Sequence, residues 1–385
     1  MQDKITSDVT HLLSPLGDTS GDNLQLVHLH IKNFRCFSNQ TIDLQGSIVL
    51  VEGNNGSGKT TLLEALHYLC YLKSFRTHSP RELIQFGKEG FFIKAQFNQS
   101  IAGQMQTHEI QVGFEGKKRL VRVDQQAISS YKELLDHYRV VTLTETDLAL
   151  INEGPDMRRS FIDQAILLYD AQFIGTMKEY KHIADNRSMV ISSGARDHEA
   201  YLVWTEQLWK KSKLIQEARQ QLLLTLGTEV NAIIRQHFGN QFKVTFTYSA
   251  KKMGSTQEFS QFMQENNSLK QEEVRFCRSL FGAHLDDFSI TFQDKRSKLY
   301  ASRGQQKLII LLVKIAQIRI LSRTRGPIIF LLDDFMTDFD SDRATVLLEI
   351  LTSLNSQLIF TSPLKTGFFE DKLVALGAHL LKLTI

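Results

Sequence analysis

The sequence predicts an α/β fold whose strand-containing part is interrupted by a helical segment. Two short apolar runs, 47–53 and 327–332, have the length and composition of strands buried on both faces. From about Tyr131 to Gly239, glycine is sparse and apolar residues recur at helical spacing, which predicts a helical hairpin or arm. A chain of 385 residues is long for one core, so two domains or one domain with an insertion are expected.

The other elements follow from the period of the apolar residues. Alternation of apolar and polar residues predicts strands, and recurrence every three or four residues predicts helices. Further strands are expected over 24–32, 91–97, 109–123, 242–248 and 288–292. Helices are expected over 61–72, 173–184, 204–233 and 305–321, with a break at 192–197.

The composition excludes several classes of protein. Apolar content of 42% and charged content of 23% are ordinary for a globular protein, and no apolar run is long enough for a membrane span. The first residues do not resemble a secretory signal, so we expect a cytoplasmic protein without a membrane partner. Three widely spaced cysteines argue against a disulfide framework. A net charge of +3 does not by itself indicate nucleic-acid binding.

Residues 53–60 match the GxxxxGK[ST] pattern of a phosphate-binding loop and stand between an expected strand and an expected helix. Its glycines let the backbone N–H groups face phosphate oxygens, and the helix N-terminus adds positive charge. Lys59 would reach the β and γ phosphates of ATP, and the Thr60 hydroxyl would coordinate Mg²⁺. The expected nucleotide-binding residues of the loop are Gly53, Asn54, Asn55, Gly56, Ser57, Gly58, Lys59, Thr60 and Thr61.

Two adjacent carboxylates, Asp333 and Asp334, follow the apolar run 327–332. Neighbouring carboxylates repel each other, and burying them is costly unless a positive charge is close by. Mg²⁺ on a bound nucleotide would supply that charge, held by Thr60 on one side and Asp333 on the other. Asp334 would then lie beside the γ-phosphate, where it could position or deprotonate the attacking water. We therefore expect Thr60 and Asp333 as metal ligands, and Lys59 and Asp334 as catalytic residues.

A second anion-binding turn precedes the expected helix 305–321. Ser302 is a good helix cap, and Gly304 with the amides of the first turn offers several N–H donors. Capped helices are common, so this turn alone is a weak signal. Together with the upstream phosphate loop and the downstream acids, it resembles the signature, Walker A and Walker B motifs of ABC-type ATPase heads.

Seven segments together resemble the RecF family of bacterial DNA replication and repair proteins. They are IKNFRCF (31–37), EGNNGSGKTTLLEAL (52–66), KSFRTHSP (73–80), EGPDMRRSFID (153–163), FGAHLDDF (281–288), SRGQQK (302–307) and LLDDFMTDFD (331–340). The resemblance extends from about Leu24 to the C-terminus. It implies an ABC-type P-loop ATPase head, SMC-like, in which a short helical lobe replaces the long coiled coil.

The resemblance also implies a division of the chain into four segments. Residues 1–24 would form an N-terminal extension that the family does not share. Residues 25–130 would form the N-terminal part of the ATPase head with Walker A, and residues 131–240 the helical lobe. Residues 241–385 would complete the head with the signature and Walker B.

Further site residues are implied by the resemblance. Arg35 should lie near the nucleotide, and Thr337 to Asp340 should cross a dimer interface. ATP would join two heads into a homodimer that hydrolyses it slowly, so that hydrolysis acts as a switch. The residues implied at the γ-phosphate held by the second subunit are Ser302, Arg303, Gly304 and Gln305.

The role that the resemblance implies is DNA binding near junctions of single and double strands, with recombinase loading alongside the mediator proteins RecO and RecR. That role belongs to DNA replication, recombination and the SOS response to damage. The chain departs from the family pattern at Ala283 and Leu285, where proline and arginine are usual, and at Asp338 and Phe339, where Glu and Leu are common. An ABC or SMC-like ATPase with another DNA-maintenance or defence role is therefore the alternative.

Four basic clusters could contact DNA phosphates. They are Lys117 to Arg119, Lys210 to Lys213, Lys251 with Lys252, and Lys295 to Lys298. Each alone is more often a solvated surface. Because no base-reading motif is evident, we expect any contact to be with the backbone of single-stranded or junction DNA and indifferent to base sequence.

Two other classes of protein are less consistent with the sequence. A transport-type ABC subunit would carry an LSGGQ-like string where SRGQQK stands, and a switch histidine within QLIFTSPL (357–364). A monomeric P-loop kinase or GTPase would not need the helix cap so close before Walker B, and no NKxD-type guanine motif is present. Asp286 and Asp287 alone are too few to indicate a nuclease.

Overall fold

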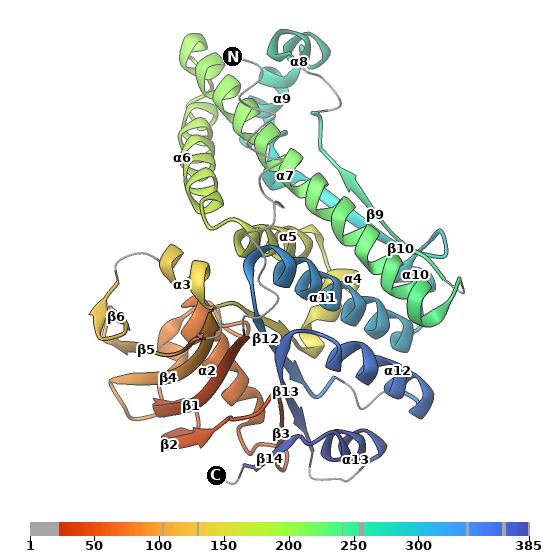
Figure 1. Ribbon diagram of the computed structural model, residues 1–385. Helices are drawn as coiled ribbons and strands as arrows, with labels where there is room; N and C mark the ends of the chain where they lie inside the picture. The colour runs from red at the N-terminus through yellow and green to blue at the C-terminus, as the bar shows by residue number, and fades with distance from the viewer. Residues whose placement is uncertain are drawn as a thin grey trace. The chain divides into compact units, whose positions relative to one another are not determined.

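The computed structural model describes residues 23–101, 104–128, 131–240, 242–253, 258–335, 339–363 and 367–383, whose elements are labelled in Figure 1. These residues fall into two compact units. The sheet unit comprises residues 23–147 and 310–383, and the arm unit comprises residues 148–309. The expected N-terminal extension, apart from its last two residues, lies outside the described residues.

The sheet unit contains a five-stranded parallel sheet in the order β14-β3-β13-β12-β8. The two apolar runs of the sequence form β3 and β12, and the residues of β3 are all buried, as are all of β12 except Asp333. Since the strands are parallel, their carboxyl ends meet at one edge, where ligands bind in such sheets. The strands are β3 (Ile48–Glu52), β8 (Val140–Leu143), β12 (Ile328–Asp333), β13 (Ser356–Ser362) and β14 (His379–Lys382).

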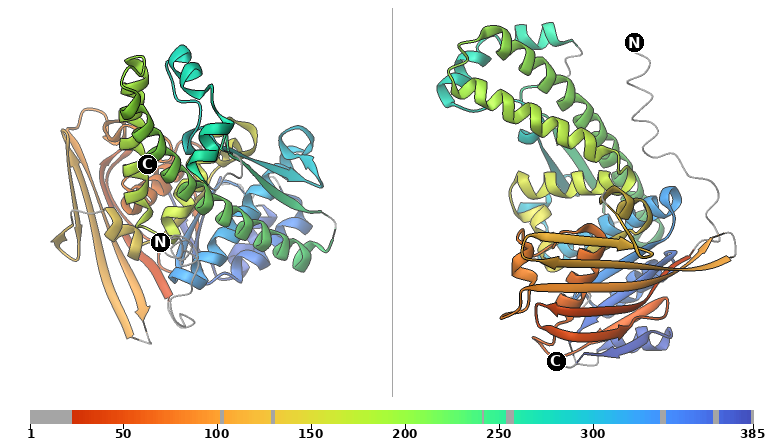
Figure 2. Two further views of the ribbon diagram at one scale, coloured as in Figure 1. Left: turned by 90° about the horizontal axis from the view of Figure 1, so that it is seen from above. Right: turned by 90° about the vertical axis from the view of Figure 1, so that its left-hand side faces the viewer.

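A six-stranded antiparallel sheet in the order β2-β1-β4-β5-β6-β7 completes the strands of the sheet unit, and Figure 2 shows its strands side by side. The buried side chain of Gln357 on β13 connects the two sheets. Its Oε1 accepts from the N–H of Leu26 at 2.8 Å, and its Nε2 donates to the carbonyl oxygens of Leu26 and Leu44. The strands are β1 (Asn23–Phe34), β2 (Phe37–Asp43), β4 (Gly90–Ile101), β5 (Gln104–Glu115), β6 (Lys118–Val123) and β7 (Gln126–Ala127).

Helix α2 (Lys59–Tyr71) packs against strands of both sheets. Twelve of its thirteen residues are buried, which explains why it is apolar on more than one face. The other elements of the sheet unit are η2 (Pro80–Leu83), α3 (Tyr131–His137), α12 (Ser341–Thr352) and α13 (Phe368–Ala375). Two elements cross the division between the units, namely η3 (Glu145–Leu148) and α11 (Arg303–Arg325).

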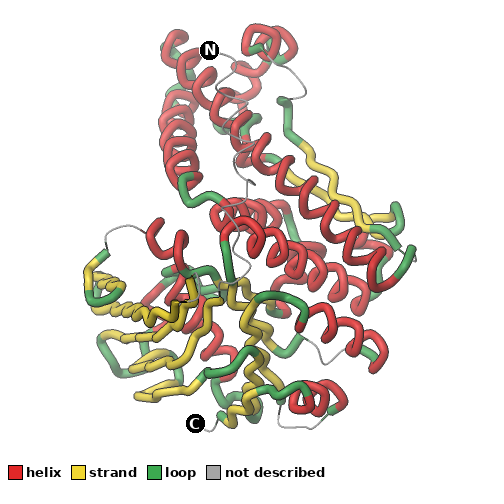
Figure 3. The backbone as a smooth tube through the Cα atoms, viewed as in Figure 1, coloured by secondary structure: helices red, strands yellow, loops and turns green. Residues whose placement is uncertain are grey.

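The arm unit is built on two long helices, α6 (Phe173–Ser192) and α7 (His198–Phe238), which are drawn red in Figure 3. Asp197 caps α7 by accepting from the N–H of Ala200 at 2.9 Å, which fixes where the break between the helices ends. The apolar stripe of α7 is buried, as its helical spacing predicts. The short elements are α4 (Ala149–Asn152), α5 (Pro155–Tyr169), β9 (Val244–Ser249), α8 (Phe259–Glu265), α9 (Leu269–Phe276), η4 (Ala283–Leu285), β10 (Asp287–Phe292), β11 (Lys295–Arg296) and α10 (Ser297–Tyr300).

A fully buried ion pair connects α6 to α9 within the arm unit. Arg187 Nη1 and Nη2 donate to the two carboxylate oxygens of Glu273 at 3.1 and 2.5 Å. Tyr201 OH also donates to Glu273, and the Arg187 guanidinium stacks over the rings of Tyr201 and Phe281. Burial raises the pKa of Tyr201, so this hydroxyl remains a donor. Removing either charged partner would leave the other buried and unpaired, which is strongly destabilising.

The strands and helices expected from periodicity are confirmed at their places in the chain. The short strands β8 and β14 were not predicted, because four residues are too few for a reliable pattern. The final part of the chain, with β13, α12 and α13, was not assigned either. No helix among the described residues is both long and apolar enough to cross a membrane.

Candidate functional site

The loop from Gly53 to Gly58 joins β3 to α2 at the carboxyl edge of the parallel sheet. Gly56 and Gly58 have φ of 86° and 87°, a left-handed conformation that favours glycine. Gly53 is constrained by space, because a Cβ there would lie 2.2 Å from Ser57 Oγ. Helix α2 begins directly after Gly58, so the unpaired N–H groups of its first turn lie at this loop.

The side chains of the loop fit the phosphates of a nucleotide. Lys59 is 9% exposed, and its Nζ donates to the carbonyl oxygens of Gly53 at 2.6 Å and Asn54 at 3.1 Å, so its charge lies inside the loop. Ser57 Oγ is buried and has no hydrogen-bond partner among the described residues, which is unusual for a hydroxyl. A phosphate oxygen would satisfy it. Among the other predicted residues of the loop, Asn54, Asn55 and Gly56 are exposed and Thr61 is buried.

The Walker A and Walker B residues meet in the sheet unit although 273 positions separate them in the chain. Thr60 Oγ1 lies 2.8 Å from Asp333 Oδ2 and 3.1 Å from Oδ1, and donates to this carboxylate. A threonine hydroxyl beside an aspartate is the pair of oxygen ligands that a Mg²⁺ ion on a nucleotide requires. The donor set therefore fits Mg²⁺, and Thr60 and Asp333 are the residues that would hold it.

Thr361 on β13 forms hydrogen bonds with both acids of Walker B. This residue was not predicted from the sequence. Its Oγ1 donates to Asp333 Oδ1 at 2.8 Å and accepts from the N–H of Asp334 at 2.9 Å. Asp334 has φ of 46° and an exposed side chain at the edge of the sheet. Strand pairing of β12 with β13 places Thr361 opposite Asp333. No local pattern marks this residue, because the contact depends on the strand order.

Arg35 lies on the turn between β1 and β2, in the left-handed conformation with φ of 52°. Its Nε and Nη2 donate to the two oxygens of the Glu64 carboxylate at 3.0 and 2.8 Å. Glu64 is fully buried on α2, four residues or about one helical turn after Thr60, and also accepts from Ser74 and Arg76. The segment KSFRTHSP (73–80) therefore contacts this buried carboxylate. The ion pair with Glu64 holds Arg35 about one helical turn from Thr60 of the phosphate loop.

The far half of α2 is anchored by a neutral histidine. His67 Nδ1 lies 2.9 Å from Thr142 Oγ1 on β8, and Lys314 Nζ donates to the carbonyl oxygen of Thr142 and pairs with Asp147 at 2.7 Å. Burial, and secondarily the charge of Lys314, lower the pKa of His67 to about 3. The imidazole therefore remains uncharged behind the phosphate loop over the physiological pH range.

The predicted signature turn belongs to the arm unit, where it begins helix α11. Ser302 Oγ accepts from the N–H of Gln305 at 3.3 Å, and Gln305 Oε1 accepts from the N–H of Ser302 at 2.8 Å. This is a reciprocal capping box, and it leaves the hydroxyl hydrogen of Ser302 available to another acceptor. Ser302 and Arg303 are exposed, and a Cβ on Gly304 would meet nothing within 4 Å. The turn can therefore be approached from solvent.

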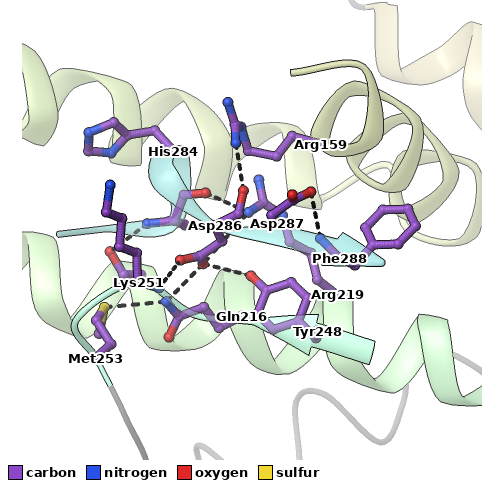
Figure 4. A network of polar contacts seen from close by, with 12 residues as sticks. Arg159, Gln216, Arg219, Tyr248, Lys251, Met253, His284, Asp286, Asp287 and Phe288 are labelled. Atoms are coloured by element: carbon purple, nitrogen blue, oxygen red, sulfur yellow. Dashed lines mark hydrogen bonds and ion pairs between the residues drawn. The ribbon is translucent and has the colours of Figure 1, made fainter. Parts of the chain in front are cut away.

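The acids of FGAHLDDF form an internal network of the arm unit rather than a metal site (Figure 4). Asp286 is fully buried, and its Oδ2 accepts from Tyr248 OH at 2.7 Å and Gln216 Nε2 at 2.9 Å. Its Oδ1 accepts from the N–H of Lys251, and Arg219 Nη1 lies 3.9 Å from Oδ2. Asp286 therefore serves as the common acceptor for Tyr248, Gln216 and Lys251 inside the arm unit. Among the described residues there is no group of three His, Cys, Asp or Glu side chains that could bind one.

The segment EGPDMRRSFID (153–163) contacts the residues around this network through Arg158 and Asp163. Arg158 pairs with both oxygens of Asp287 at 2.6 and 3.0 Å, and Arg219 with both oxygens of Asp163 at 2.8 and 2.9 Å. Two of the motifs that resemble RecF thus pack against each other as structural elements. Sequence reasoning gave them no role, since the pairs span up to 129 positions.

One of the departures from the family pattern, alanine in place of proline at position 283, has a structural explanation. Ala283 is buried, its carbonyl oxygen accepts from Arg219 Nη1 at 2.6 Å, and its N–H donates to Ser212 Oγ at 3.3 Å. A proline would lack that donor, whereas alanine retains it. Leu285 is half-buried. Asp338 and the first half of the predicted loop Thr337 to Asp340 lie outside the described residues.

In two of the predicted DNA clusters, some of the lysines form ion pairs within the protein. Lys210 pairs with Glu206, Lys211 with Glu179 and Lys252 with Glu272, at 2.7, 2.5 and 2.6 Å. Two other lysines of these clusters, Lys117 and Lys118, are exposed, as are Lys295, Arg296 and Lys298. The clusters look alike in sequence, but they differ in whether their described lysines form ion pairs with glutamates.

A family model described as an AAA domain matches residues 28–324. This is well over half of the chain, so the chain belongs to the AAA domain family. Within it, the chain is similar to the DNA replication and repair protein RecF of Desulfitobacterium hafniense (strain DSM 10664 / DCB-2), which is 25% identical over 352 residues covering 89% of this chain and 94% of the relative. The resemblance to RecF that the motifs indicate is thereby confirmed.

Two solved structures have the same fold. The recombination mediator protein RecF with ATP in the RecFOR pathway superposes with a TM-score of 0.78 at 22% identity, covering 90% of this chain and 95% of that one. An Smc head domain from Pyrococcus furiosus bound to the C-terminal domain of ScpA gives a TM-score of 0.50 at 15% identity, covering 90% of this chain and 91% of that one. The expected fold, an ABC-type ATPase head of the SMC-like kind, is confirmed by these likenesses.

Proposed function

We propose that this protein is an ATP-binding ATPase of DNA replication and repair. The observation that carries the proposal is the contact of Thr60 with Asp333, which brings the two expected ligands of Mg²⁺ together beside the phosphate loop. Lys59 and the N–H groups at the start of α2 would hold the phosphates of ATP. Bound Mg²⁺ would neutralise phosphate charge, and Thr60 and Asp333 would hold it.

Asp334 follows the metal ligand and is proposed as the residue that orients the attacking water. Its exposed carboxylate lies at the carboxyl edge of the sheet, and its backbone N–H is held by Thr361. A carboxylate in this place can accept a proton from water as the phosphoryl bond breaks. A single carboxylate outside a closed site is a weak base, so we expect slow hydrolysis that serves as a switch.

We further propose that ATP joins two copies of the chain. The turn of Ser302, Arg303, Gly304 and Gln305, whose first two residues are exposed, offers hydroxyl, guanidinium and backbone donors, and would contact the γ-phosphate bound by the other copy. Arg35, fixed by Glu64 about one turn from the loop, would act beside the nucleotide of its own chain. The division into an ATPase head (25–130 and 241–385), a helical lobe (131–240) and an N-terminal extension (1–24) is part of this proposal.

The biological role is proposed from the relatives. Proteins named for DNA replication and repair match about nine-tenths of this chain, and the RecF structure is described within a RecFOR pathway. By analogy, the dimer would bind DNA at single-strand to double-strand junctions in the cytoplasm and help RecO and RecR to load the recombinase. Recognition would depend on DNA shape and backbone, because no base-reading element is evident.

The test is the solution mass of an Asp334→Asn variant, measured by light scattering with and without Mg·ATP. We expect the mass to double with Mg·ATP, because ATP is retained when the proposed water-orienting group is removed. Adding Lys59→Met should abolish doubling by removing nucleotide binding, and adding Ser302→Arg should abolish it with ATP still bound. A mass that stays monomeric while ATP is demonstrably bound would contradict the dimer and favour a single-headed P-loop enzyme.

A further inference from the structure

The arm unit has a pocket of about 760 Å³ that the proposed ATPase does not use. It lies between the C-terminal half of α7, strand β9 and the turn from β10 to β11, elements that lie side by side in Figure 1. Leu223, Phe242 and Phe246 contribute apolar surface to it. Its wall is fixed by Asn231, whose side chain both donates to and accepts from the backbone of Val244. We call this the α7 pocket.

The α7 pocket is lined by more positive than negative charge. Arg235 and Lys243 line it, and Asp294 is the acid that accompanies them. Neither cation forms an ion pair with any described residue. Arg235 and Lys243 are both exposed, so their charge is available to a ligand. The mixture of aromatic, amide and cationic surface suits a flat, anionic, partly polar ligand better than a purely apolar one.

Three further cations stand on β11 and α10, directly after the pocket-lining turn in the chain. Gln293 and Asp294 line the pocket, and Lys295, Arg296 and Lys298 follow at once in the chain. All three of these cations are exposed, and among the described residues none has an acidic partner within ion-pair distance. The lysines of α7 differ, because Lys210 and Lys211 are paired with glutamates.

An exposed aromatic ring lies within this charged surface. Tyr300 is 66% exposed, and Lys295 Nζ lies 5.7 Å from the centroid of its ring. Exposed aromatic rings beside cations are what single-stranded nucleic acids use, since a base stacks on the ring while its phosphate meets the cation. A base within a duplex is stacked on its neighbours, so it can reach neither the ring nor the pocket without being unpaired.

We propose that the α7 pocket and the adjoining surface of Lys295, Arg296, Lys298 and Tyr300 form a binding site for single-stranded DNA. The cations contact phosphates, Tyr300 stacks on a base, and the α7 pocket receives a base that is turned out of the strand. This inference rests on the proposed role in DNA binding and names its site and its strand preference. Tyr300 lies two residues before Ser302, so the site adjoins the proposed ATP-dependent contact in sequence.

The first experiment measures the affinity of the full-length protein for a fluorescein-labelled oligothymidylate by anisotropy, with and without Mg·ATP, over a series of salt concentrations. For the triple variant Lys295→Gln/Arg296→Gln/Lys298→Gln we expect at least a tenfold loss of affinity. Since each phosphate contact contributes about 0.7 to the salt slope on a single strand, the slope should fall by about 2. The matched control is Lys210→Gln/Lys211→Gln/Lys213→Gln, which removes the same charge from α7 and should retain the affinity and the slope.

The second experiment tests stacking. Tyr300→Ala should weaken oligothymidylate binding by about fivefold or more, because stacking of one base contributes at least that factor. Tyr300→Phe should bind like the unmodified protein, since it keeps the ring. Binding to a duplex of the same length should change much less in both variants. Tyr300 and the three cations of the triple variant are exposed, whereas Lys211 and Lys213 of the control are half-buried. Circular dichroism shows whether each variant is folded.

The outcomes are distinguishable. If the unmodified protein binds neither single-stranded nor duplex DNA in any nucleotide state, the proposed DNA function itself fails. If it binds DNA but the triple variant binds equally well, the site is elsewhere and the inference is wrong while the function stands. Equal losses for single strand and duplex with no effect of Tyr300→Ala would overturn the single-strand assignment. Displacement of the oligonucleotide by poly-L-glutamate of equal charge would overturn it in favour of an acidic polypeptide.

Discussion

The chain contains the dipeptide Asp-Asp twice in comparable settings, and the two pairs have different surroundings. Asp286 in the arm unit is fully buried, and its carboxylate accepts from a phenol, an amide and a backbone N–H. Asp333 in the sheet unit accepts, among the described residues, from two hydroxyls, those of Thr60 and Thr361. The Thr60 hydroxyl can itself be a ligand of Mg²⁺ on a nucleotide, whereas the groups around Asp286 already use its carboxylate as an acceptor inside the arm unit. The comparison teaches that a carboxylate is structural or functional according to its donors, not its sequence neighbours.

The largest expected effect is on stability at Asp286. Asp286→Ala should lower the free energy of unfolding of the arm unit by about 3–5 kcal/mol, because the donors of Gln216, Tyr248 and Lys251 would lose their buried acceptor. Chemical denaturation followed by circular dichroism measures this. Asp286→Asn, which keeps the shape, should cost less, and nucleotide binding should be unchanged at temperatures where the variant is folded. A loss of nucleotide affinity in the folded variant would break the distinction between the two pairs.

The second effect is the response of the sheet unit to acid. Because the pKa of His67 is lowered from its ordinary value of 6.5 to about 3, the unfolded chain binds a proton below pH 6.5 that the folded chain does not. Stability should therefore be retained above pH 6.5 and lost as the pH falls, by about 2 kcal/mol between pH 7 and pH 5. His67→Gln should remove this part of the pH dependence. Parallel pH profiles for the variant and the unmodified protein would show that another group is responsible.

The third effect separates binding from stability at Walker B. Asp333→Asn should weaken Mg²⁺-dependent nucleotide binding by at least about tenfold and change the unfolding free energy by less than about 1 kcal/mol, since its partners are two neutral hydroxyls that can also hydrogen-bond to an amide. Binding of Mn²⁺, followed by electron paramagnetic resonance, gives a readout apart from hydrolysis. Thr361→Val should produce a smaller loss of Mn²⁺ affinity in the same assay. If Asp333→Asn destabilised the fold as much as Asp286→Ala, the two acid pairs would not differ in kind.

Much of the site was predictable because its residues are adjacent in sequence. The loop 53–60 is a continuous motif between a strand and a helix, and its geometry follows from glycines at fixed positions. Asp333 and Asp334 were predicted because they directly follow a buried strand. Thr361 and Glu64 were not predicted, since one depends on the pairing of β12 with β13 and the other on the turn that carries Arg35.

The sequence by itself determined the α/β class, the phosphate loop and the order of its motifs, because these depend on local spacing, glycine positions and apolar period. Tertiary structure decided which of two similar acid pairs is saturated with donors and which basic clusters are paired with glutamates. It also decided that Gln293 and Asp294, which directly precede Lys295 and Arg296, line a pocket. The physical reason is that burial, ion pairing and desolvation are properties of neighbours in space, and such neighbours are up to 331 positions apart along this chain.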